Sequence, residues 1–463
     1  MERKEEMVKL LTDDQDEPIV TWREKFLGII QRGEGTSNIN LLSYYFATLI
    51  SISLFVYINA NQRFVLTNYI NTPEDEIGRA SGDLAFYNEL VIILVSWGWG
   101  YLSDAMRNRS FIYSASFILM AIGIELYPTA PNFGILVLFR VIFALGAAAN
   151  ASMLTAVLAD STSNRDRGRA TGLLGVTTGL GAVIASLLFL KISNIGYNAG
   201  LTLKQAGYIS YSFVALLSVV AAFVVLFGLK DGISTNKENE KKNVNLFQIL
   251  KQGIVAAKDP LVLLSYAASF VARGDSVLIT TFITLWVGRD MELLHGADPS
   301  QSAKMGGIIS GVAQTCALCS APFWGFLADN VSRVSALIAA SIISGIGYTS
   351  MIFISDVTYG IVYLPICLIG IGEIGVIIGS QILVTQSAPK EARGGVSGIF
   401  SLCGAFGILI ATKVGGILFD KWRPGGTFVL FGIFNFLLSI IALIVLVVNI
   451  IKNRRQSTTI NHE

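Results

Sequence analysis

Ionisable side chains interrupt the long apolar runs of this sequence, and their chemistry needs explaining first. A charge inside a membrane-spanning helix costs about 2.5–3.5 kcal/mol on insertion scales. Such a residue is therefore expected to face a water-filled cavity or to pair with another charge. We take these residues as candidates for binding a solute or a proton. They are Glu89, Glu125, Arg140, Arg273, Asp275, Glu373 and Lys413.

Arg273 and Asp275 flank Gly274 near the middle of the apolar run 261–287. Residues two apart point to different faces of a helix, so these two charges are not expected to pair on a regular helix. Gly274 would permit a local break, and interrupted helices near the bilayer midplane often form binding sites. The alternative is that each charge pairs with a different helix and only positions it.

Glu373 lies among small residues in the stretch 370–375. Burial disfavours the charged form of a carboxylate, a property that suits a proton carrier. The same carboxylate could equally be locked to Arg273 or Lys413 across a helix bundle. The sequence leaves both interpretations open.

The composition excludes a soluble protein and predicts a membrane protein. The chain is 53% hydrophobic and 14% charged, whereas soluble domains carry about 25% charged residues. A spanning helix needs about 20 apolar residues, and unpaired backbone groups in lipid force such runs to be helical. Twelve runs qualify: 41–61, 84–102, 111–129, 134–158, 170–192, 207–228, 261–287, 305–328, 334–354, 358–384, 396–419 and 427–449.

Polar segments divide the chain into five predicted parts. These are an N-terminal tail (1–40), a six-helix bundle (41–228), a linker with an amphipathic helix at 244–257 (229–259), a second six-helix bundle (260–449) and a C-terminal tail (450–463). Lysine and arginine concentrate in the tails, the linker and the loops on the same side. The positive-inside rule then predicts that both termini are cytosolic.

The N-terminal tail contains an acidic dileucine pattern formed by Glu6, Leu10 and Leu11. This pattern resembles an adaptor-read address for lysosomes or vacuoles. The alternative is that the two leucines form the apolar side of a short amphipathic helix. The expected location is therefore the plasma membrane or a lysosomal or vacuolar membrane.

A short motif of glycine, spacer, leucine, small residue and aspartate occurs at 100–104 and again at 325–329. Arg107 and Arg109 follow the first copy, and Arg333 follows the second. A second pair of loops repeats at nearly the same offset. Its copies begin at Arg167 and Arg393, each leading into an apolar run. Two loops repeated at one offset indicate two similar halves related in parallel.

The loop at Gly100 and Asp104 resembles the signature between helices 2 and 3 of the major facilitator superfamily, although Ala105 replaces its usual arginine. Arg140 and Gly146 resemble the family's arginine–glycine element of helix 4. The resemblance covers residues 41–449. It implies an all-α membrane protein with 12 transmembrane helices in two pseudo-symmetric six-helix bundles.

The resemblance also implies functions for particular residues. In the family, the loop carboxylates bond a neighbouring helix terminus and nearby arginines, which holds the cytosolic side shut. The alternative is that they only orient their loops. The gate residues so implied are Asp104, Arg107, Arg109, Arg167, Asp329, Arg333 and Arg393.

Arg63 belongs to a stretch, 59–64, that resembles a pattern of asparagine, two spacers, aspartate and arginine in some branches of the family. Gln62 stands where the aspartate would be, which removes a titratable group. Arg63 joins the site candidates if the first helix continues to about Ile70. Otherwise it lies on the far surface.

The expected function is alternating-access transport of a small organic solute across the lipid bilayer, driven by the solute gradient or by protons. The alternative is a non-transporting receptor or scaffold on the same fold. The chain has no Walker-type loop, so we expect no nucleotide, and its net charge of +2 indicates no nucleic-acid partner. Two histidines without paired metal-ligand spacing, and cysteines only within apolar runs, predict no cofactor, no metal and no enzyme activity.

Overall fold

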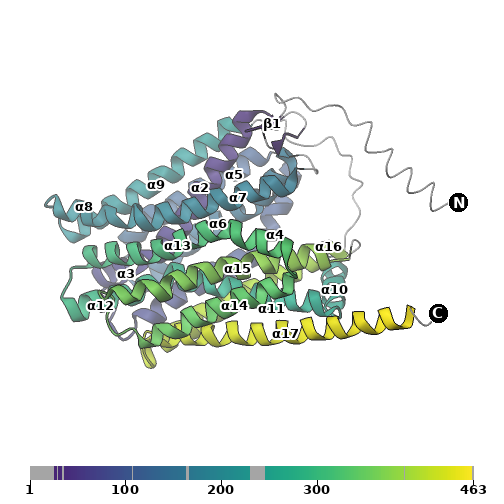
Figure 1. The fold of residues 1–463 in the computed structure, drawn as a ribbon. Coiled ribbons are helices and arrows are strands. Elements are labelled where there is room, and N and C mark those ends of the chain that lie inside the picture. The colour runs from purple at the N-terminus through teal and green to yellow at the C-terminus, as the bar shows by residue number, and fades with distance from the viewer. Residues whose placement is uncertain are drawn as a thin grey trace.

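Two groups of helices lie against each other, the first in purple and blue and the second in green and yellow (Figure 1). The computed structural model describes residues 25–28, 30–33, 36–106, 108–162, 166–229, 246–389 and 392–460. The sorting pattern of Glu6, Leu10 and Leu11 lies outside these residues. So does Arg107.

The first half contains six spanning segments, three of them continued by short helical turns. Its elements are α2 (Asn38–Ala60), α3 (Gln62–Val65), the π-helical η2 (Leu66–Ile70), α4 (Ile77–Met106), α5 (Arg109–Leu126), η3 (Tyr127–Thr129), α6 (Phe133–Ser161), α7 (Arg167–Leu187), η4 (Phe189–Lys191), α8 (Ile192–Asn198) and α9 (Leu203–Gly228).

The second half repeats this arrangement after α10 (Leu246–Ala256). Its elements are α11 (Pro260–Val277), the π-helical η5 (Leu278–Phe282), α12 (Ile283–His295), α13 (Pro299–Asn330), α14 (Arg333–Ser350), η6 (Met351–Phe353), η7 (Gly360–Val362), α15 (Tyr363–Ser387), α16 (Arg393–Lys421) and α17 (Gly426–Ile460).

Eleven helical segments among the described residues are long and apolar enough to cross a membrane. The twelfth spanning helix is α4, whose 30 residues extend about 45 Å at 1.5 Å per residue. Arg79, Asp83 and Glu89 make its first half more polar than the others. The predicted architecture of twelve helices in two bundles is confirmed.

The two ends of the bundle differ, and we name them by what lies there (Figure 1). The termini end carries α10, the end of α17 and a short hairpin of β1 (Lys25–Phe26) and β2 (Ile30–Gln31). The opposite end carries α8 and α12, and we call it the far end.

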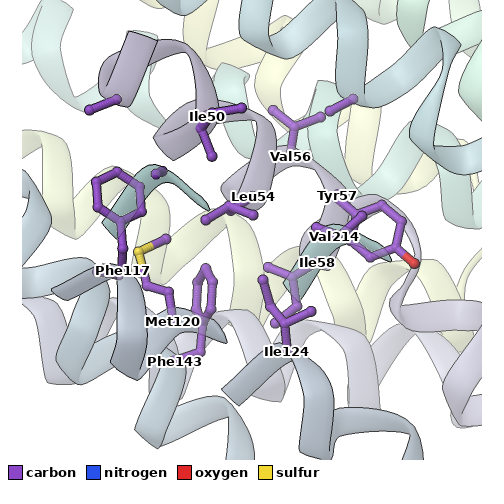
Figure 2. Packing of buried hydrophobic residues seen from close by; sticks show 14 of the residues in the cluster. Ile50, Leu54, Val56, Tyr57, Ile58, Phe117, Met120, Ile124, Phe143 and Val214 are labelled. Carbon is purple, nitrogen blue, oxygen red and sulfur yellow. The ribbon is translucent and has the colours of Figure 1, made fainter. Parts of the chain in front are cut away.

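Close packing of α2 against α5, α6 and α9 forms the core of the first half (Figure 2). Leu54 and Ile58 face Met120 and Ile124 there, and the ring of Phe143 closes the same layer. Small residues permit this approach: a Cβ on Gly123 would lie 2.7 Å from the backbone nitrogen of Phe143. In lipid, where no hydrophobic force pulls helices together, such packing is the main source of association.

Two segment boundaries differ from the sequence-based expectation. The first helix begins at Asn38 and, after a break at Asn61, continues through α3 and η2 to Ile70. The last helix continues beyond the predicted end at 449, to Ile460. Helix α10 is held against the second half, because the Tyr266 hydroxyl donates to the Gly253 carbonyl at 2.9 Å. A helix predicted to lie on the membrane surface therefore packs on protein.

The residues just before α2 are part of the first half and do not form a free tail. Phe26 stacks on Tyr45 with ring centroids 5.8 Å apart, and the Gly33 N–H donates to the Ser161 carbonyl at 2.9 Å. Arg32 also forms an antiparallel bridge with Thr162. The last part of the predicted N-terminal tail therefore packs on the first half.

Candidate functional site

The two halves approach each other most closely where α4 crosses α16. A Cβ on Gly82 would collide with the Thr412 carbonyl, and a Cβ on Gly416 would lie 2.6 Å from the carbonyl of Gly78. Both helices thus present glycines at the crossing, and their backbones meet without intervening side chains. Such contacts between small residues allow helices in lipid to pack closely.

Polar contacts between the halves follow α4 from the far end toward the centre. Asp420 of α16 accepts hydrogen bonds from the N–H groups of Gly78 at 2.8 Å and Arg79 at 2.6 Å. One turn further along, the Lys413 ammonium lies 2.6 Å from the Asp83 carboxylate. We call these contacts, with the pair described next, the α4 ladder.

Glu89 and Arg273 form the innermost step of the α4 ladder. Glu89 is partly buried on α4, within electrostatic range of Arg273 on α11. The Arg273 side chain passes over Gly404 of α16, where a Cβ would lie 2.7 Å from its Cγ. Arg273 is itself exposed. A carboxylate of one half and a guanidinium of the other therefore attract each other near mid-helix, although they form no hydrogen bond or ion pair in this conformation.

Arg63 forms a second connection between the halves at the far end. Its guanidinium is buried and lies 2.8 Å from both Glu74, in its own half, and Glu292 on α12. Gly288 leaves room for the arginine, because a Cβ there would lie 2.5 Å from Arg63 Cδ. The first helix does continue to Ile70, which places Arg63 inside the protein.

The described residues of the termini end show no such contact between the halves. Each hydrogen bond or ion pair that joins the halves in the described part of the chain involves far-end residues: the Arg63 cluster, the Asp420 and Lys413 contacts, and a 3.4 Å bond from Asn194 to Ser300. Toward the termini end of α4, a Cβ on Gly98 or Gly100 would meet nothing within 4 Å. Among the described residues, the hydrogen bonds and ion pairs that join the halves therefore lie at the far end.

Two carboxylates are buried together in the second half. Asp275 has no exposed surface and accepts hydrogen bonds from Asn435 Nδ2 at 3.0 and 3.1 Å and from the Ser344 hydroxyl at 3.3 Å. Glu373 is 5% exposed and accepts from the Ser276 hydroxyl at 2.6 Å. Within the described part of the chain, no lysine or arginine lies in ion-pair distance of either carboxylate.

The local break that Gly274 would permit does not occur. Helix α11 is continuous through Gly274, which packs against the ring of Phe431 so closely that a Cβ would collide with it. The irregular turn comes later, as the π-helical η5 at Leu278–Phe282. Arg273 and Asp275 do point to different environments, one exposed and one fully buried.

Arg140 is wholly buried inside the first half. It donates a hydrogen bond to the Asn59 side chain, and its guanidinium lies over the Phe143 ring, 5.5 Å from the centroid. Tyr127 lies beside it. Arg140 thus forms a separate polar centre in the first half, opposite the carboxylates of the second.

A family model described as Major Facilitator Superfamily matches residues 38–412 and 268–461. The chain belongs to the major facilitator superfamily. As in this family, it is a multi-pass membrane transporter of small-molecule solutes, and the family points away from an enzyme.

Among relatives, the magnetosome protein MamH of Paramagnetospirillum magneticum is 27% identical over 392 residues, covering 83% of this chain and 87% of that protein. Among solved structures, a point variant of the nucleoside transporter NupG is similar with a TM-score of 0.70 at 12% identity, covering 88% of this chain and 99% of that one. A bacterial homologue of the human lysosomal transporter Spinster, in an inward-facing and unoccupied conformation, gives a TM-score of 0.63 at 14% identity, covering 89% and 98%.

The major facilitator gate loops lie at the termini end. Arg109 pairs with Asp160 at 2.8 Å within the first half. Arg333 and Arg393 are exposed and form no ion pair with a described residue. The side chains of Asp104, Arg167 and Asp329 lie outside the described set.

Two other expectations about charged residues need correction. Glu125 lies one residue from the end of α5, is exposed, and accepts a hydrogen bond from the Ser212 hydroxyl at 2.8 Å, so it does not face the space between the halves. Glu373 is not paired with Lys413, which instead contacts Asp83. The carboxylates missed from the sequence all lie outside the predicted apolar runs: Glu74, Asp83, Glu292 and Asp420.

Proposed function

We propose that this transporter moves a small organic solute by alternating access and that the conformation described is open to the cytosol. The contacts that join the halves at the far end only are the observation that carries this proposal. The concentration of basic residues at the termini end supports a cytosolic position for that end. The membrane is expected to be the plasma membrane or that of a lysosome or vacuole.

We further propose that the gate loops close the termini end in the opposite conformation. As the α4 ladder opens, the halves approach at the termini end. Asp104 and Asp329 would then bond the neighbouring helix ends and their arginines. Carboxylates at helix N-termini gain about 0.3–1 kcal/mol each. Such contacts are strong enough to hold a conformation and weak enough to be reversed.

The solute is proposed to carry both a positive and a negative group. Glu89 and Arg273 belong to opposite halves and attract each other further along α4 than the far-end contacts. A solute that binds each of them can replace their mutual attraction, so binding and the movement of the halves become linked. A yeast relative named vacuolar basic amino acid transporter 1, 28% identical over 38% of this chain, is compatible with such a solute.

Uptake into proteoliposomes tests the proposal. A thermal-shift screen of zwitterionic and singly charged solutes selects ligands, and labelled ligands are then assayed for uptake. We expect Glu89→Gln and Arg273→Ala each to reduce uptake at least about tenfold, equivalent to roughly 1.4 kcal/mol. Saturable binding without any uptake would instead favour the receptor or scaffold alternative.

Proton coupling is the finer part of the proposal. A carboxylate that lies in a spanning segment without a neighbouring cation is costly when it is ionised. Asp275 and Glu373 are both in this situation, and hydroxyl and amide donors lie a few ångströms from them. We propose that this pair takes up and releases a proton as the halves move. A pH-independent uniporter is the alternative.

Uptake under an imposed pH gradient should distinguish the two. We expect a proton gradient to stimulate the unaltered protein, and Glu373→Gln and Asp275→Asn each to lose that stimulation by about tenfold. Glu125→Gln is the matched control, because it removes a carboxylate exposed to the outside of the bundle. Normal stimulation in both buried variants would remove this pair from the mechanism.

A further inference from the structure

Three metal-ligating side chains lie together at the far end, apart from the space between the halves. Asp290 and His295 come from the end of α12, and Asp356 comes from the loop between η6 and η7. One ligand atom from each lies within 4.8 Å of the others. His295 Nε2 and Asp356 Oδ1 are 3.0 Å apart.

Backbone and side-chain donors hold both carboxylates in place. Asp290 Oδ2 accepts from the Val357 N–H at 2.7 Å. Asp356 Oδ1 accepts from the Thr358 N–H at 2.8 Å and from its hydroxyl at 2.7 Å. Each carboxylate thus keeps its other oxygen available. Hydrogen bonds of this kind orient the ligands of a metal site.

We infer that Asp290, His295 and Asp356 form a binding site for a divalent transition-metal ion of the Zn²⁺ type. One imidazole with two carboxylates is a ligand set that Zn²⁺ accepts, with solvent at the remaining position. Mg²⁺ and Ca²⁺ prefer oxygen ligands alone. Metal–ligand distances of about 2.0–2.2 Å place tetrahedral ligand atoms roughly 3.4 Å apart, so the three groups need to shift by about an ångström or less.

The charge balance favours a metal over a simple ion pair. A histidine–aspartate contact needs only one carboxylate, yet Asp290 lies in the same cluster. Two carboxylates around one imidazole leave negative charge that a divalent cation would neutralise. The ion would also tie the end of α12 to the loop at Asp356, only a turn away from Glu292, which binds Arg63 of the other half. Metal binding is therefore expected to stiffen the element that carries the far-end contact.

Calorimetry on the full-length protein, purified in detergent and stripped of metal by a chelator, tests the inference with ZnCl₂ as the probe. We expect one equivalent of Zn²⁺ to bind, with an affinity at least about tenfold lower in His295→Ala and in Asp356→Asn. His462→Ala removes the other histidine of the chain, and Glu76→Gln removes an exposed far-end carboxylate. Both controls should bind as the unaltered protein does.

A substitution that keeps a metal ligand distinguishes the loss of metal binding from the loss of folding. His295→Cys should retain binding, and with Co²⁺ it should develop a thiolate-to-metal charge-transfer band that the unaltered protein lacks. Absence of saturable Zn²⁺ binding by the unaltered protein would overturn the inference. Equal binding by His295→Ala, or no such band in His295→Cys, would do the same.

Discussion

Replacing Gly82 by leucine is expected to abolish transport while the protein still folds. Gly82 lies against the Thr412 carbonyl where α4 crosses α16, so any side chain there must push the two halves apart at the far end. Overpacking costs about 1–3 kcal/mol, which shifts an equilibrium between two conformations by roughly 5- to 150-fold. The far-end-open conformation should then dominate, and the cycle should stop.

Spin labels at Ile195 and Leu293 would measure this shift, because both are exposed far-end residues of opposite halves. We expect a longer label-to-label distance in Gly82→Leu, together with uptake below a tenth of normal. Gly360→Leu is the control at the same end of the protein, on an exposed glycine where an added Cβ would meet nothing within 4 Å. Unchanged distances and uptake in Gly82→Leu would mean that the crossing of α4 and α16 opens too little to matter.

Replacing Arg63 by alanine is expected to have the second large effect. The change leaves the Glu74 and Glu292 carboxylates near each other without the cation that both contact. Removing one partner of a buried ion pair costs about 3–5 kcal/mol, and the loss here should be smaller because the side chains of Glu74 and Glu292 are 34% and 14% exposed. Because Glu292 belongs to the other half, most of this loss should fall on the far-end-closed conformation.

The same pair of spin labels and a thermal-unfolding measurement would report the result. We expect a longer far-end distance and a lower unfolding temperature for the closed form in Arg63→Ala. Arg79→Ala is a suitable control, since its side chain is exposed and only its backbone N–H contacts Asp420. If Arg63→Ala and Arg79→Ala behave alike, the Arg63 cluster contributes nothing to far-end closure.

Apolar run length and the repeated loops were enough to predict the twelve helices and the two halves. Bilayer thickness fixes the length of a spanning helix, and backbone hydrogen bonding fixes its type. The intramembrane charges also pointed to Arg273, Asp275 and Glu373, whose part in a binding site stays a prediction. These are strong local signals that need no knowledge of tertiary packing.

The partners of those charges could not be predicted in the same way. Asp83 pairs with Lys413, which is far from it in sequence, and the predicted run began one residue after Asp83. The unpaired Lys413 was itself a signal that a carboxylate had to lie across the bundle. Similarly, Asp356 joins His295 only because a loop folds back against α12.

The order of the contacts in the α4 ladder has a kinetic consequence. Asp420, Lys413 and Arg273 meet α4 at successive positions, at its start, near Asp83 and near Glu89. They can therefore break one after another, so the activation barrier reflects a single contact and not their sum. Partly exposed ion pairs contribute about 0–1 kcal/mol each. The far-end contacts should then open one after another. This opening should occur on the microsecond-to-millisecond timescale of domain motions, and it should be faster as the salt concentration rises.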